Sequence, residues 1–395
     1  MFHKANRARL ELASRGALVV LTGYDALQWS GDMDVPFMQE SSFWWLTGID
    51  EPGWKLILET ARPHATLVRP VQSEIERVFL GGISDDEALK ISGADEIITT
   101  EELEARLRQL SRMHTVAETI IDRRSHSSSV ANPALGNLQR LLKRTFASVD
   151  NCQQTLQRLR AIKQPEELAR LRRAIALTTD AFSSVRENLT NFKTEYELEA
   201  EFTYRFRRAN ATHAYQPIVA NGAHACTLHY DQNSGKIAAR QTTVIDIGAR
   251  VDGYSADITR TYCANPTKRQ IAVHAAAEQA QKQIIELIRP GESVVDYVTK
   301  SDELMKRALM QLDLLKDKND VETFRRYYPH ATSHGLGVDT HDSLGQPRIF
   351  EPGMVLTVEP GIYIAEESIG VRIEDDILVT NDGRENLSSA LPTAL

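Results

Sequence analysis

Two aspartates, Asp246 and Asp257, occupy strand-like sequence where a buried strand would normally carry apolar side chains. They lie in VIDIGARVDGYSADITRTY, residues 244–262, and the dipeptide Asp252-Gly253 in its middle is typical of a two-residue hairpin turn. A hairpin folded there places Asp246 opposite Thr259 and sets both carboxylates on one face of the ribbon as diagonal neighbours. Such a pair could hold a cation, although an isolated strand aspartate is more often a turn cap or a solvated side chain.

Histidine and glutamate side chains in later segments could join these aspartates. The segment HATSHGLGVDTHD places His330, His334 and His341 in a glycine-bearing loop, whereas a lone histidine would more often be an ordinary core or surface residue. Glu359 ends an apolar strand-like run immediately before a Pro-Gly turn. A glutamate at the end of a buried strand needs a partner, so these side chains are candidates for the same site.

The segment IGVRIEDDILVT, residues 369–380, adds another carboxylate. Strand alternation places Arg372 and Glu374 on the same face, where the arginine can support the glutamate. For Asp375 and Asp376 we expect an ordinary salt-bridged strand.

Together, these segments predict four carboxylates and one imidazole at a single site: Asp246, Asp257, Glu359, Glu374 and His334. Four close carboxylates repel one another unless cations lie among them. A set rich in oxygen with one nitrogen suits two divalent ions such as Mn²⁺, Co²⁺ or Zn²⁺. Two such ions can activate a water and polarise a carbonyl, which is hydrolytic chemistry.

The elements that position these residues fall into two parts, which fits a chain of 395 residues. Up to about residue 150, strand-like runs alternate with helical stretches, which predicts an α/β domain. Beyond it a long helical run, with Pro165 where a second helix would begin, leads into an α+β region. We expect domains at 1–150 and 151–395. The strand-like runs of the first domain are residues 17–23, 54–59, 65–70, 77–82 and 115–123.

Composition narrows the functional classes. The net charge of −8 does not favour nucleic acid as a partner, and no segment resembles an export signal or a membrane span. The cysteines Cys152, Cys226 and Cys263 are scattered without metal-binding spacing, which predicts free thiols. A cytoplasmic protein with no membrane partner is therefore expected.

The ordered motifs resemble a known family. D-I-G, A-D-I-T-R-T, S-H-G-L-G, T-V-E-P-G-I-Y and V-R-I-E-D-D, with the LRAIKQPEE segment and the LHY segment of His229, are similar to the catalytic domain of the pita-bread metallopeptidases. The resemblance covers residues 151–395. It implies an α+β chain in which a pita-bread catalytic domain, of the creatinase/aminopeptidase type, follows a smaller α/β creatinase-like N-terminal domain.

The resemblance also implies roles for individual residues. Asp246 would bind one metal ion and His334 and Glu359 the other, while Asp257 and Glu374 would bridge both. His229 and His341 would stabilise the tetrahedral intermediate and hold the substrate, and Glu359 could also carry a proton to the leaving nitrogen. The remaining residues matched to substrate contacts are His330, Arg372 and Tyr215.

The N-terminal segment GDMDVPFMQESSFWWLTGIDEP resembles the aminopeptidase P, prolidase and creatinase branch of the family. In that branch the domain caps a neighbouring active site across an oligomer, which implies a homodimer or homotetramer. Asp32 matches an acidic residue beside the substrate's amino end, although a loop carboxylate is more often solvated.

The expected function is a Xaa-Pro aminopeptidase, whose substrates are peptides with proline at the second position. A prolyl nitrogen carries no hydrogen, so such a bond needs a dedicated pocket. The alternative is prolidase, a Xaa-Pro dipeptidase. It is disfavoured by the short stretch between Glu359 and Glu374, which lacks the insertion that carries a carboxylate-binding arginine in some prolidases. A non-peptidase binding module of this fold is more remote, because all five ligand positions are filled.

Overall fold

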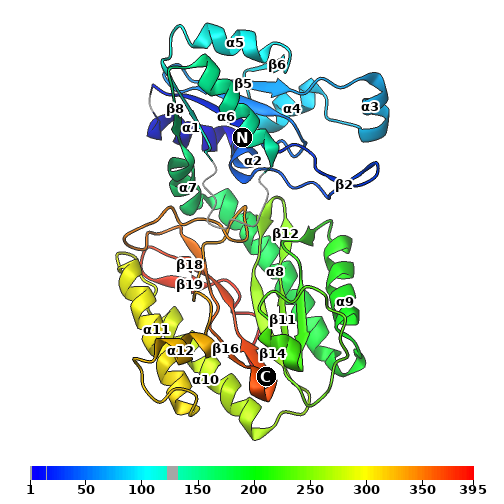
Figure 1. Ribbon diagram of the computed structural model, residues 1–395, viewed down its shortest axis with the longest axis vertical. Coiled ribbons are helices and arrows are strands. Elements are labelled where there is room, and N and C mark those ends of the chain that lie inside the picture. The colour runs from blue at the N-terminus through cyan, green and yellow to red at the C-terminus, as the bar shows by residue number, and fades with distance from the viewer. Residues whose placement is uncertain (1, 15, 122–131) are drawn as a thin grey trace. The chain divides into compact units, whose positions relative to one another are not determined.

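The computed structural model describes residues 2–14, 16–121 and 132–395 (Figure 1). Its contacts divide the chain into two compact units, unit 1 at Met1–Leu159 and unit 2 at Arg160–Leu395. Among the described residues, no helix is both long enough and apolar enough to cross a membrane.

Unit 1 is built on a mixed sheet with the strand order β6-β5-β4-β1-β7-β8. The central strands β1 and β4 are antiparallel, whereas β7 and β8 run parallel to β1. Helices α5 and α6 contribute leucines to the apolar core on the sheet. This arrangement confirms an α/β domain. The strands are β1 (Leu18–Thr22), β4 (Lys55–Glu59), β5 (His64–Arg69), β6 (Glu96–Thr99), β7 (Val116–Thr119) and β8 (Ser148–Asn151), with a small hairpin of β2 (Gln28–Ser30) and β3 (Met33–Asp34).

The strand predicted at 77–82 is wrong, because this segment lies in a short helix, α3 (Glu74–Leu80). Ser73 accepts a hydrogen bond from the Glu76 backbone N–H, and the Glu76 carboxylate accepts one from the Ser73 backbone N–H. This reciprocal capping box fixes the first helical turn. The local cap therefore overrides the strand propensity of the apolar run. The other helices of unit 1 are α1 (Phe2–Ala13), α2 (Ser41–Thr47), α4 (Asp85–Ser92), α5 (Leu103–Leu110), α6 (Pro133–Thr145) and α7 (Gln153–Ala161), whose last two residues belong to unit 2.

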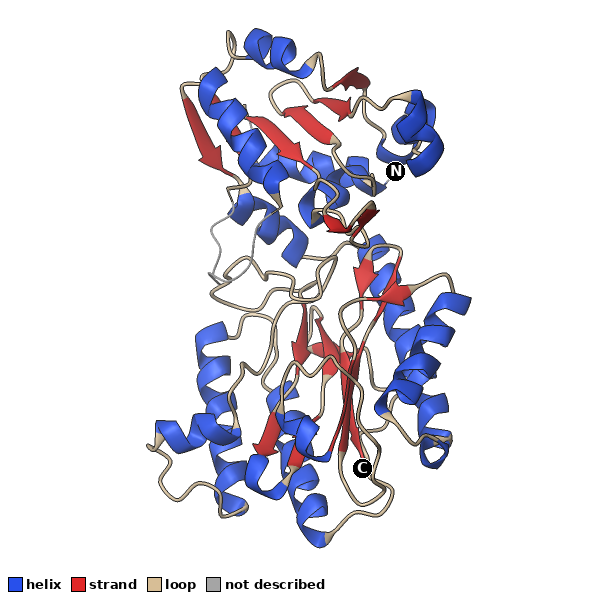
Figure 2. Ribbon diagram, turned by 45° about the vertical axis from the view of Figure 1, so that its right-hand side comes forward, coloured by secondary structure: helices blue, strands red, loops and turns tan. Residues whose placement is uncertain are grey.

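Unit 2 has strands between two groups of helices (Figure 2). The first group, α8 and α9, packs with β11 and β14 around one apolar core, and the second group packs with β15–β18 around another. Pro165 is the first residue of α8, as predicted. The helices are α8 (Pro165–Glu187), α9 (Glu195–Arg208), α10 (Lys268–Ile285), α11 (Val294–Gln311) and α12 (Val321–Tyr327), and short 3₁₀ turns occur at Leu189–Asn191, Gly222–Cys226 and Ala365–Glu367.

The strands of unit 2 form several small sheets, in the orders β10-β11-β14, β13-β12-β9, β15-β18-β19 and β16-β17. This mixture of helices and strands confirms the α+β prediction. The strand bounds are β9 (Thr212–His213), β10 (Ile218–Asn221), β11 (Thr243–Ile247), β12 (Ala249–Val251), β13 (Tyr254–Ser255), β14 (Ile258–Tyr262), β15 (Val355–Val358), β16 (Gly361–Ile364), β17 (Ile369–Arg372), β18 (Asp375–Val379) and β19 (Arg384–Asn386).

The hairpin predicted for residues 244–262 is confirmed in its register. Asp246 lies opposite Thr259. The turn residues Asp252 and Gly253 both have positive φ angles, 47° and 81°, as a two-residue type I′ turn requires.

Candidate metal centre

Asp246 and Asp257 lie close together in the hairpin, as their spacing predicts. Asp246 lies on β11, and Asp257 directly precedes β14. The Tyr215 hydroxyl lies 2.5 Å from Asp246 Oδ1 and 2.6 Å from Asp257 Oδ1. The two strands can approach here because residue 248 is glycine, since a Cβ on it would lie 1.7 Å from the carbonyl oxygen of Ala256. One phenolic proton therefore faces two carboxylates.

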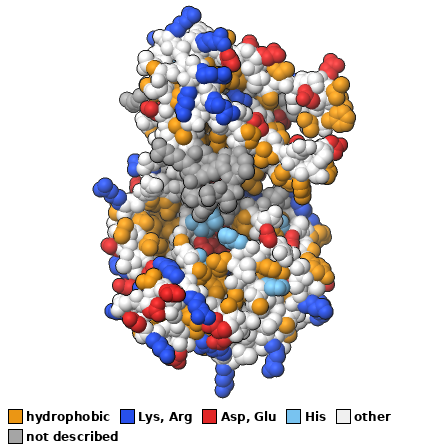
Figure 3. Space-filling model, viewed as in Figure 1, with side chains coloured by type: hydrophobic (Ala, Val, Ile, Leu, Met, Phe, Trp, Pro, Cys, Tyr) orange, Lys and Arg blue, Asp and Glu red, His pale blue; other side chains and the backbone are white. Residues whose placement is uncertain are grey.

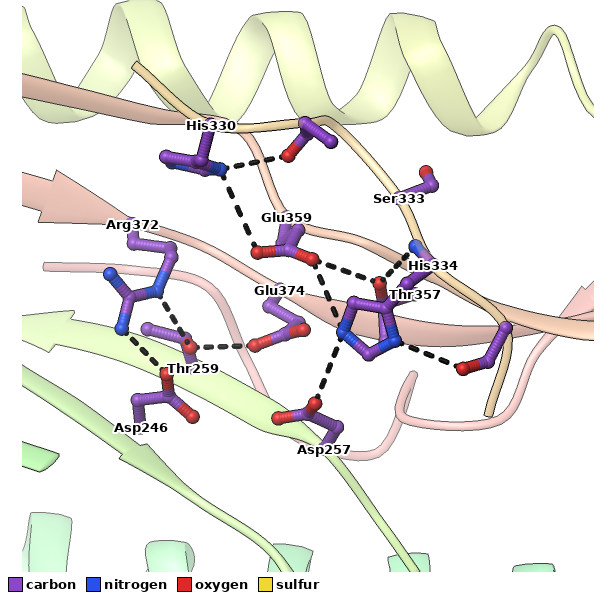
Figure 4. A network of polar contacts seen from close by, with 12 residues as sticks. Asp246, Asp257, Thr259, His330, Ser333, His334, Thr357, Glu359, Arg372 and Glu374 are labelled. Carbon is purple, nitrogen blue, oxygen red and sulfur yellow. Dashed lines mark hydrogen bonds and ion pairs between the residues drawn. The ribbon is translucent and has the colours of Figure 1, made fainter. Parts of the chain in front are cut away.

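His334 faces the carboxylates through one ring nitrogen. Its Nε2 atom lies 3.3 Å from Asp257 Oδ2 and 3.3 Å from Glu359 Oε1 (Figure 4). Its Nδ1 atom lies 3.0 Å from the Gly335 carbonyl oxygen, to which it can donate. A hydrogen bond of this kind fixes the tautomer and leaves Nε2 available as a metal ligand. Burial opposes protonation, but the Asp257 and Glu359 carboxylates outweigh it and raise the pKa of His334 to about 9.

Glu359 leaves the end of β15 and points toward the same centre. Its Oε1 atom accepts a hydrogen bond from the Thr357 hydroxyl at 3.2 Å, and its Oε2 atom lies 3.7 Å from His330 Nδ1. Burial raises the pKa of Glu359 to about 7, with nearby Asp257 and Asp246 adding to the shift and His334 opposing it. The carboxyl group thus titrates near neutrality in the metal-free site.

Glu374 lies between β17 and β18 and is only 2 % exposed. Its Oε2 atom accepts a hydrogen bond from the Thr259 hydroxyl at 2.7 Å. Burial raises the pKa of Glu374 well above its usual range, and the neighbouring carboxylates of Asp257, Glu359 and Asp246 raise it further.

Arg372 supports Glu374 through Thr259 and through its charge, and its direct hydrogen bonds go to other partners. Arg372 Nη2 donates to Asp246 Oδ2 at 2.6 Å, and Nη1 donates to the Tyr363 hydroxyl at 2.9 Å. The continuous strand assumed for residues 369–380 is interrupted at Glu374, so strand alternation does not carry through to it. The hydrogen-bond path from Arg372 to Glu374 runs through Thr259, whose hydroxyl accepts from the arginine Nε at 3.2 Å.

The two aspartates that follow differ from each other. Asp375 is salt-bridged as predicted, with its Oδ1 atom 2.6 Å from Arg260 Nη2. Asp376 is fully buried, and its Oδ2 atom accepts a hydrogen bond from the Asp257 backbone N–H at 3.3 Å. Asp376 therefore supports the backbone of a predicted metal ligand.

The loop with His334 and His341 is anchored by buried charges. Asp342 lies 3.0 Å from Arg160 Nη2 through its Oδ1 atom and 3.6 Å from Lys163 Nζ through its Oδ2 atom. Both cations come from the LRAIKQPEE segment at the start of unit 2. The ring of His341 packs against that of His334 at an interplanar angle of 57°, with 4.2 Å between centroids.

A cavity of about 800 Å³ opens onto these residues. Histidine and acidic side chains gather on this face of unit 2 in Figure 3. Every predicted site residue of unit 2 lines the cavity: Tyr215, His229, Asp246, Asp257, His330, His334, His341, Glu359, Arg372 and Glu374. Asp32 lies in unit 1, exposed in the turn between β2 and β3.

Some polar residues at the centre were not identified from the sequence. Tyr363 lies on β16, and its hydroxyl lies 2.9 Å from His330 Nε2 as well as from Arg372. Thr357 and Thr259 supply the hydroxyls that bond Glu359 and Glu374. The predicted hairpin register already placed Thr259 opposite Asp246, so Thr259 could have been identified from the sequence. Tyr363 is a single tyrosine in an apolar run, and nothing in that run indicates a functional residue.

The donor set fits divalent cations. Potential ligand atoms of Asp246, Asp257 and Glu374 lie within 4.8 Å of one another, and so do those of His334, Glu359 and Glu374. Among the described residues that line the cavity, the four carboxylates Asp246, Asp257, Glu359 and Glu374 face a single arginine, Arg372, and bound cations would balance the remaining negative charge. Asp257, His334 and His341 form another such group, so geometry alone leaves open whether His341 is a ligand.

Comparison with known proteins defines the class. Residues 169–381 match metallopeptidase family M24, and residues 3–119 match the aminopeptidase P N-terminal domain. The chain belongs to metallopeptidase family M24. It has the fold of that family, an N-terminal domain followed by a pita-bread domain, and the family implies divalent metal ions.

The similarity to individual proteins extends over the whole chain. A Xaa-Pro aminopeptidase of Escherichia coli K12 is 30 % identical, with 99 % of this chain and 94 % of that protein aligned. Human Xaa-Pro aminopeptidase 3 is 31 % identical over 95 % of this chain and 78 % of that protein. The solved structure of E. coli aminopeptidase P with the inhibitor Pro-Leu superposes with a TM-score of 0.87 at 30 % identity, covering 100 % of this chain and 95 % of that chain.

Proposed function

We propose that this protein is a metal-dependent Xaa-Pro aminopeptidase, which hydrolyses the bond between an N-terminal residue and a following proline. The observation that carries the proposal is the convergence of Asp246, Asp257, His334, Glu359 and Glu374 on one cavity, in a chain that belongs to a metallopeptidase family. Relatives that align along nearly the whole chain include proteins named Xaa-Pro aminopeptidase and Xaa-Pro aminopeptidase 3.

The five ligands would hold two divalent ions. Asp246 would bind one ion, His334 and Glu359 the other, and Asp257 and Glu374 both. Mn²⁺ is our first choice, with Co²⁺ and Zn²⁺ as alternatives, because oxygen ligands predominate. When bound, two such ions polarise the scissile carbonyl and lower the pKa of a water.

The protein's own side chains supply proton transfer and orientation. Glu359 lines the cavity and can accept a proton from the attacking water and pass it to the leaving prolyl nitrogen. His229 and His341 line the cavity and would donate hydrogen bonds to the oxygen that gains charge. Burial lowers the pKa of His330 to about 4, so this ring stays neutral, and its bond to Tyr363 would orient it toward the substrate.

Arg372 and Tyr215 act on the metal centre as well as on the substrate pocket. The guanidinium holds Asp246 from one side, and the Tyr215 phenol bonds it from the other. Both side chains also line the cavity, which supports their assignment as substrate contacts.

Prolidase is the second candidate, and the cavity disfavours it. A dipeptidase must bind the carboxylate that directly follows the proline ring. Among the described residues that line the cavity, Arg372 is the one arginine or lysine, and its guanidinium is bonded to Asp246 and Tyr363. A peptide that continues beyond proline would leave no unpaired carboxylate there.

One assay separates the two functions. We expect the Mn²⁺-loaded protein to cleave a tripeptide such as Ala-Pro-Ala faster than the dipeptide Ala-Pro, with release of the first residue. Faster cleavage of the dipeptide would establish prolidase. No cleavage of either by fully metal-loaded protein would favour a non-peptidase binding role.

The remaining proposals concern assembly and location. A domain at 1–150 would mediate a homodimer or homotetramer, cap an active site and place Asp32 beside the substrate's amino end. Self-association is supported by α3, which exposes Ile75, Val78 and Phe79, and hydrophobic side chains gather over this helix in Figure 3. A cytoplasmic location is supported by the three cysteines, all of which are free thiols.

A further inference from the structure

One wall of the cavity is a segment without strand or α-helix, residues 222–235, which follows β10. It contributes Leu228, His229 and Asp231 to the lining. In the part of the chain that the structure describes, the His229 ring makes no hydrogen bond or ion pair of its own. The position of this ring therefore depends on how the backbone of the segment is held.

A single buried carboxylate holds the segment at both ends. Glu195, the first residue of α9, is 0 % exposed. Its Oε1 atom accepts a hydrogen bond from the Asn221 backbone N–H at 2.8 Å, and its Oε2 atom accepts one from the Gly235 backbone N–H at 2.6 Å. The Glu195 backbone N–H donates in return to the Gly235 carbonyl at 2.9 Å.

The same carboxylate also bonds two side chains inside the segment. The Tyr230 hydroxyl donates to Oε2 at 2.9 Å, and His224 Nδ1 lies 2.9 Å from Oε1. The rings of these two residues stack with 4.4 Å between centroids. Tyr230 directly follows His229 in the chain, so the anchored phenol fixes the backbone next to the cavity histidine.

The close approach of the segment to Glu195 depends on residue 235 being glycine. A Cβ at that position would lie 2.7 Å from Glu195 Oε2. Hydrogen bonds from backbone N–H groups to a buried carboxylate are stronger than neutral ones, and a fully satisfied network rigidifies its surroundings. The distances describe such a network, with donors on both carboxylate oxygens.

We propose that Glu195 is a positioning residue for catalysis, which holds the 222–235 wall so that His229 meets the substrate. This inference rests on the proposed peptidase function. Glu195 touches neither the predicted metal ligands nor the cavity, so its effect must pass through the segment it bonds. The side chain acts on orientation and leaves the metal centre intact.

The test is Glu195→Gln, which keeps the shape of the side chain but replaces one acceptor oxygen with a donor. We expect kcat/KM for an Ala-Pro-Ala substrate to fall by about 10–100-fold, as for a misplaced reacting geometry, while bound metal stays at the wild-type level. The matched control is Glu197→Gln on the same helix, since Glu197 caps α9 through the Lys193 and Thr194 backbone N–H groups. The control should match the wild type in kcat/KM.

A double-mutant cycle measured by kcat/KM distinguishes a positioning role from a merely structural one. In a His229→Ala background, Glu195→Gln should change kcat/KM by less than about threefold, because residues that act through one another are not additive. An equal fall in both backgrounds would overturn the proposal, and so would loss of metal in Glu195→Gln. If that variant fails to fold, Tyr230→Phe removes one bond to Oε2, together with the bond that the hydroxyl accepts from the Ser234 backbone N–H, and should show the same dependence on His229.

Hydrogen exchange distinguishes failure of this inference from failure of the proposed function. Glu195→Gln should accelerate amide exchange across residues 221–235 and leave the 244–262 hairpin unchanged, whatever reaction the protein performs. Unchanged exchange in the segment would overturn the positioning role. A wild-type protein that cleaves no Xaa-Pro peptide would instead overturn the proposed function.

Discussion

Two buried glutamates of unit 2, Glu195 and Glu374, have the same chemistry but different surroundings. Glu195 is 0 % exposed and accepts hydrogen bonds from two backbone N–H groups and a phenol, with an imidazole nitrogen also within bonding distance. Glu374 is 2 % exposed, and its one hydrogen-bond donor among the described residues is Thr259. Its other polar neighbours include Asp246 and Asp257, whose oxygens lie within 4.8 Å.

The surroundings of a buried carboxylate distinguish a structural group from a metal ligand. A buried carboxylate surrounded by donors is already stabilised and holds its segment in place. A buried carboxylate among other carboxylates is unstable in its charged form, and the pKa of Glu374 is raised accordingly, first by burial and then by its acidic neighbours. Only a cation restores that charge.

The largest effect should follow from removing a carboxylate that lies among other carboxylates, as Glu374 and Asp257 do. Glu374→Gln or Asp257→Asn should lower kcat/KM by ~10³-fold or more, since each removes a proposed bridging ligand from a metal centre whose catalysis contributes several kcal/mol. Metal analysis should show reduced loading with the fold retained by circular dichroism. As a control, Glu385→Gln changes a half-exposed carboxylate that is paired with Arg172 and should leave metal content unchanged. Full activity and full loading in a bridging-residue variant would contradict a dinuclear site.

The variant His341→Ala tests whether His341 is a metal ligand. We expect His341→Ala to lower kcat by about 10²-fold, the cost of losing one hydrogen-bond donor to the developing charge, with metal content near the wild-type level. The measurement is turnover together with metal analysis of the same sample. Loss of metal would show that His341 is a ligand, as its distance to Asp257 and His334 permits.

The affinity for metal should depend on pH. Metal must displace a proton from His334, whose pKa is about 9 in the metal-free site, and from Glu359, whose pKa is about 7. We expect affinity to rise between pH 6 and pH 9 by about tenfold per pH unit for each proton displaced. Calorimetric titration in buffers of different ionisation enthalpy would count the released protons. A pH-independent affinity would contradict these shifts.

His334 and Glu359 also make the stability of the metal-free protein depend on pH. This stability should fall as pH rises, whereas the affinity for metal should increase. Both pKa values are raised above their unfolded values, 6.5 for the histidine and 4.5 for the glutamate. The stability that these two groups contribute is therefore fully present below their unfolded pKa values. It is lost as pH rises through about 7 for Glu359 and about 9 for His334. The melting temperature of metal-free protein should fall across this window, whereas metal-loaded protein should change less.

Asp32 provides a third kind of carboxylate, exposed in a turn of unit 1. If it contacts the substrate's ammonium group, Asp32→Asn should raise KM for free-amino peptides by about 10–100-fold, the equivalent of roughly 1.5–3 kcal/mol for one charge-assisted hydrogen bond. An N-acetylated peptide should be a poor substrate of the wild type and should gain relative to the free peptide in the variant. Equal ratios of kcat/KM for both proteins would remove Asp32 from the site.

The sequence determined much of the local structure. The Asp252-Gly253 turn and the alternation around it fixed the register that brings Asp246 and Asp257 together, because both signals act over a few residues. Pro165 marked the start of α8 in the same way. The strand expected at 77–82 failed because its apolar run was weighed without the capping box that begins at Ser73.

Tertiary structure alone decided which partner each charged group received. Arg372 bonds Asp246 and not Glu374, since the chain leaves β17 before Glu374 and enters another sheet with β18. Glu195 reaches Asn221 and Gly235 across 26 and 40 positions, which no local pattern encodes. Residue types and short periodicities identify which side chains can bind a cation. Whether a carboxylate is hydrogen-bonded by donors or remains available to a cation depends on contacts between distant segments. These contacts exist only when both cores of unit 2 are packed.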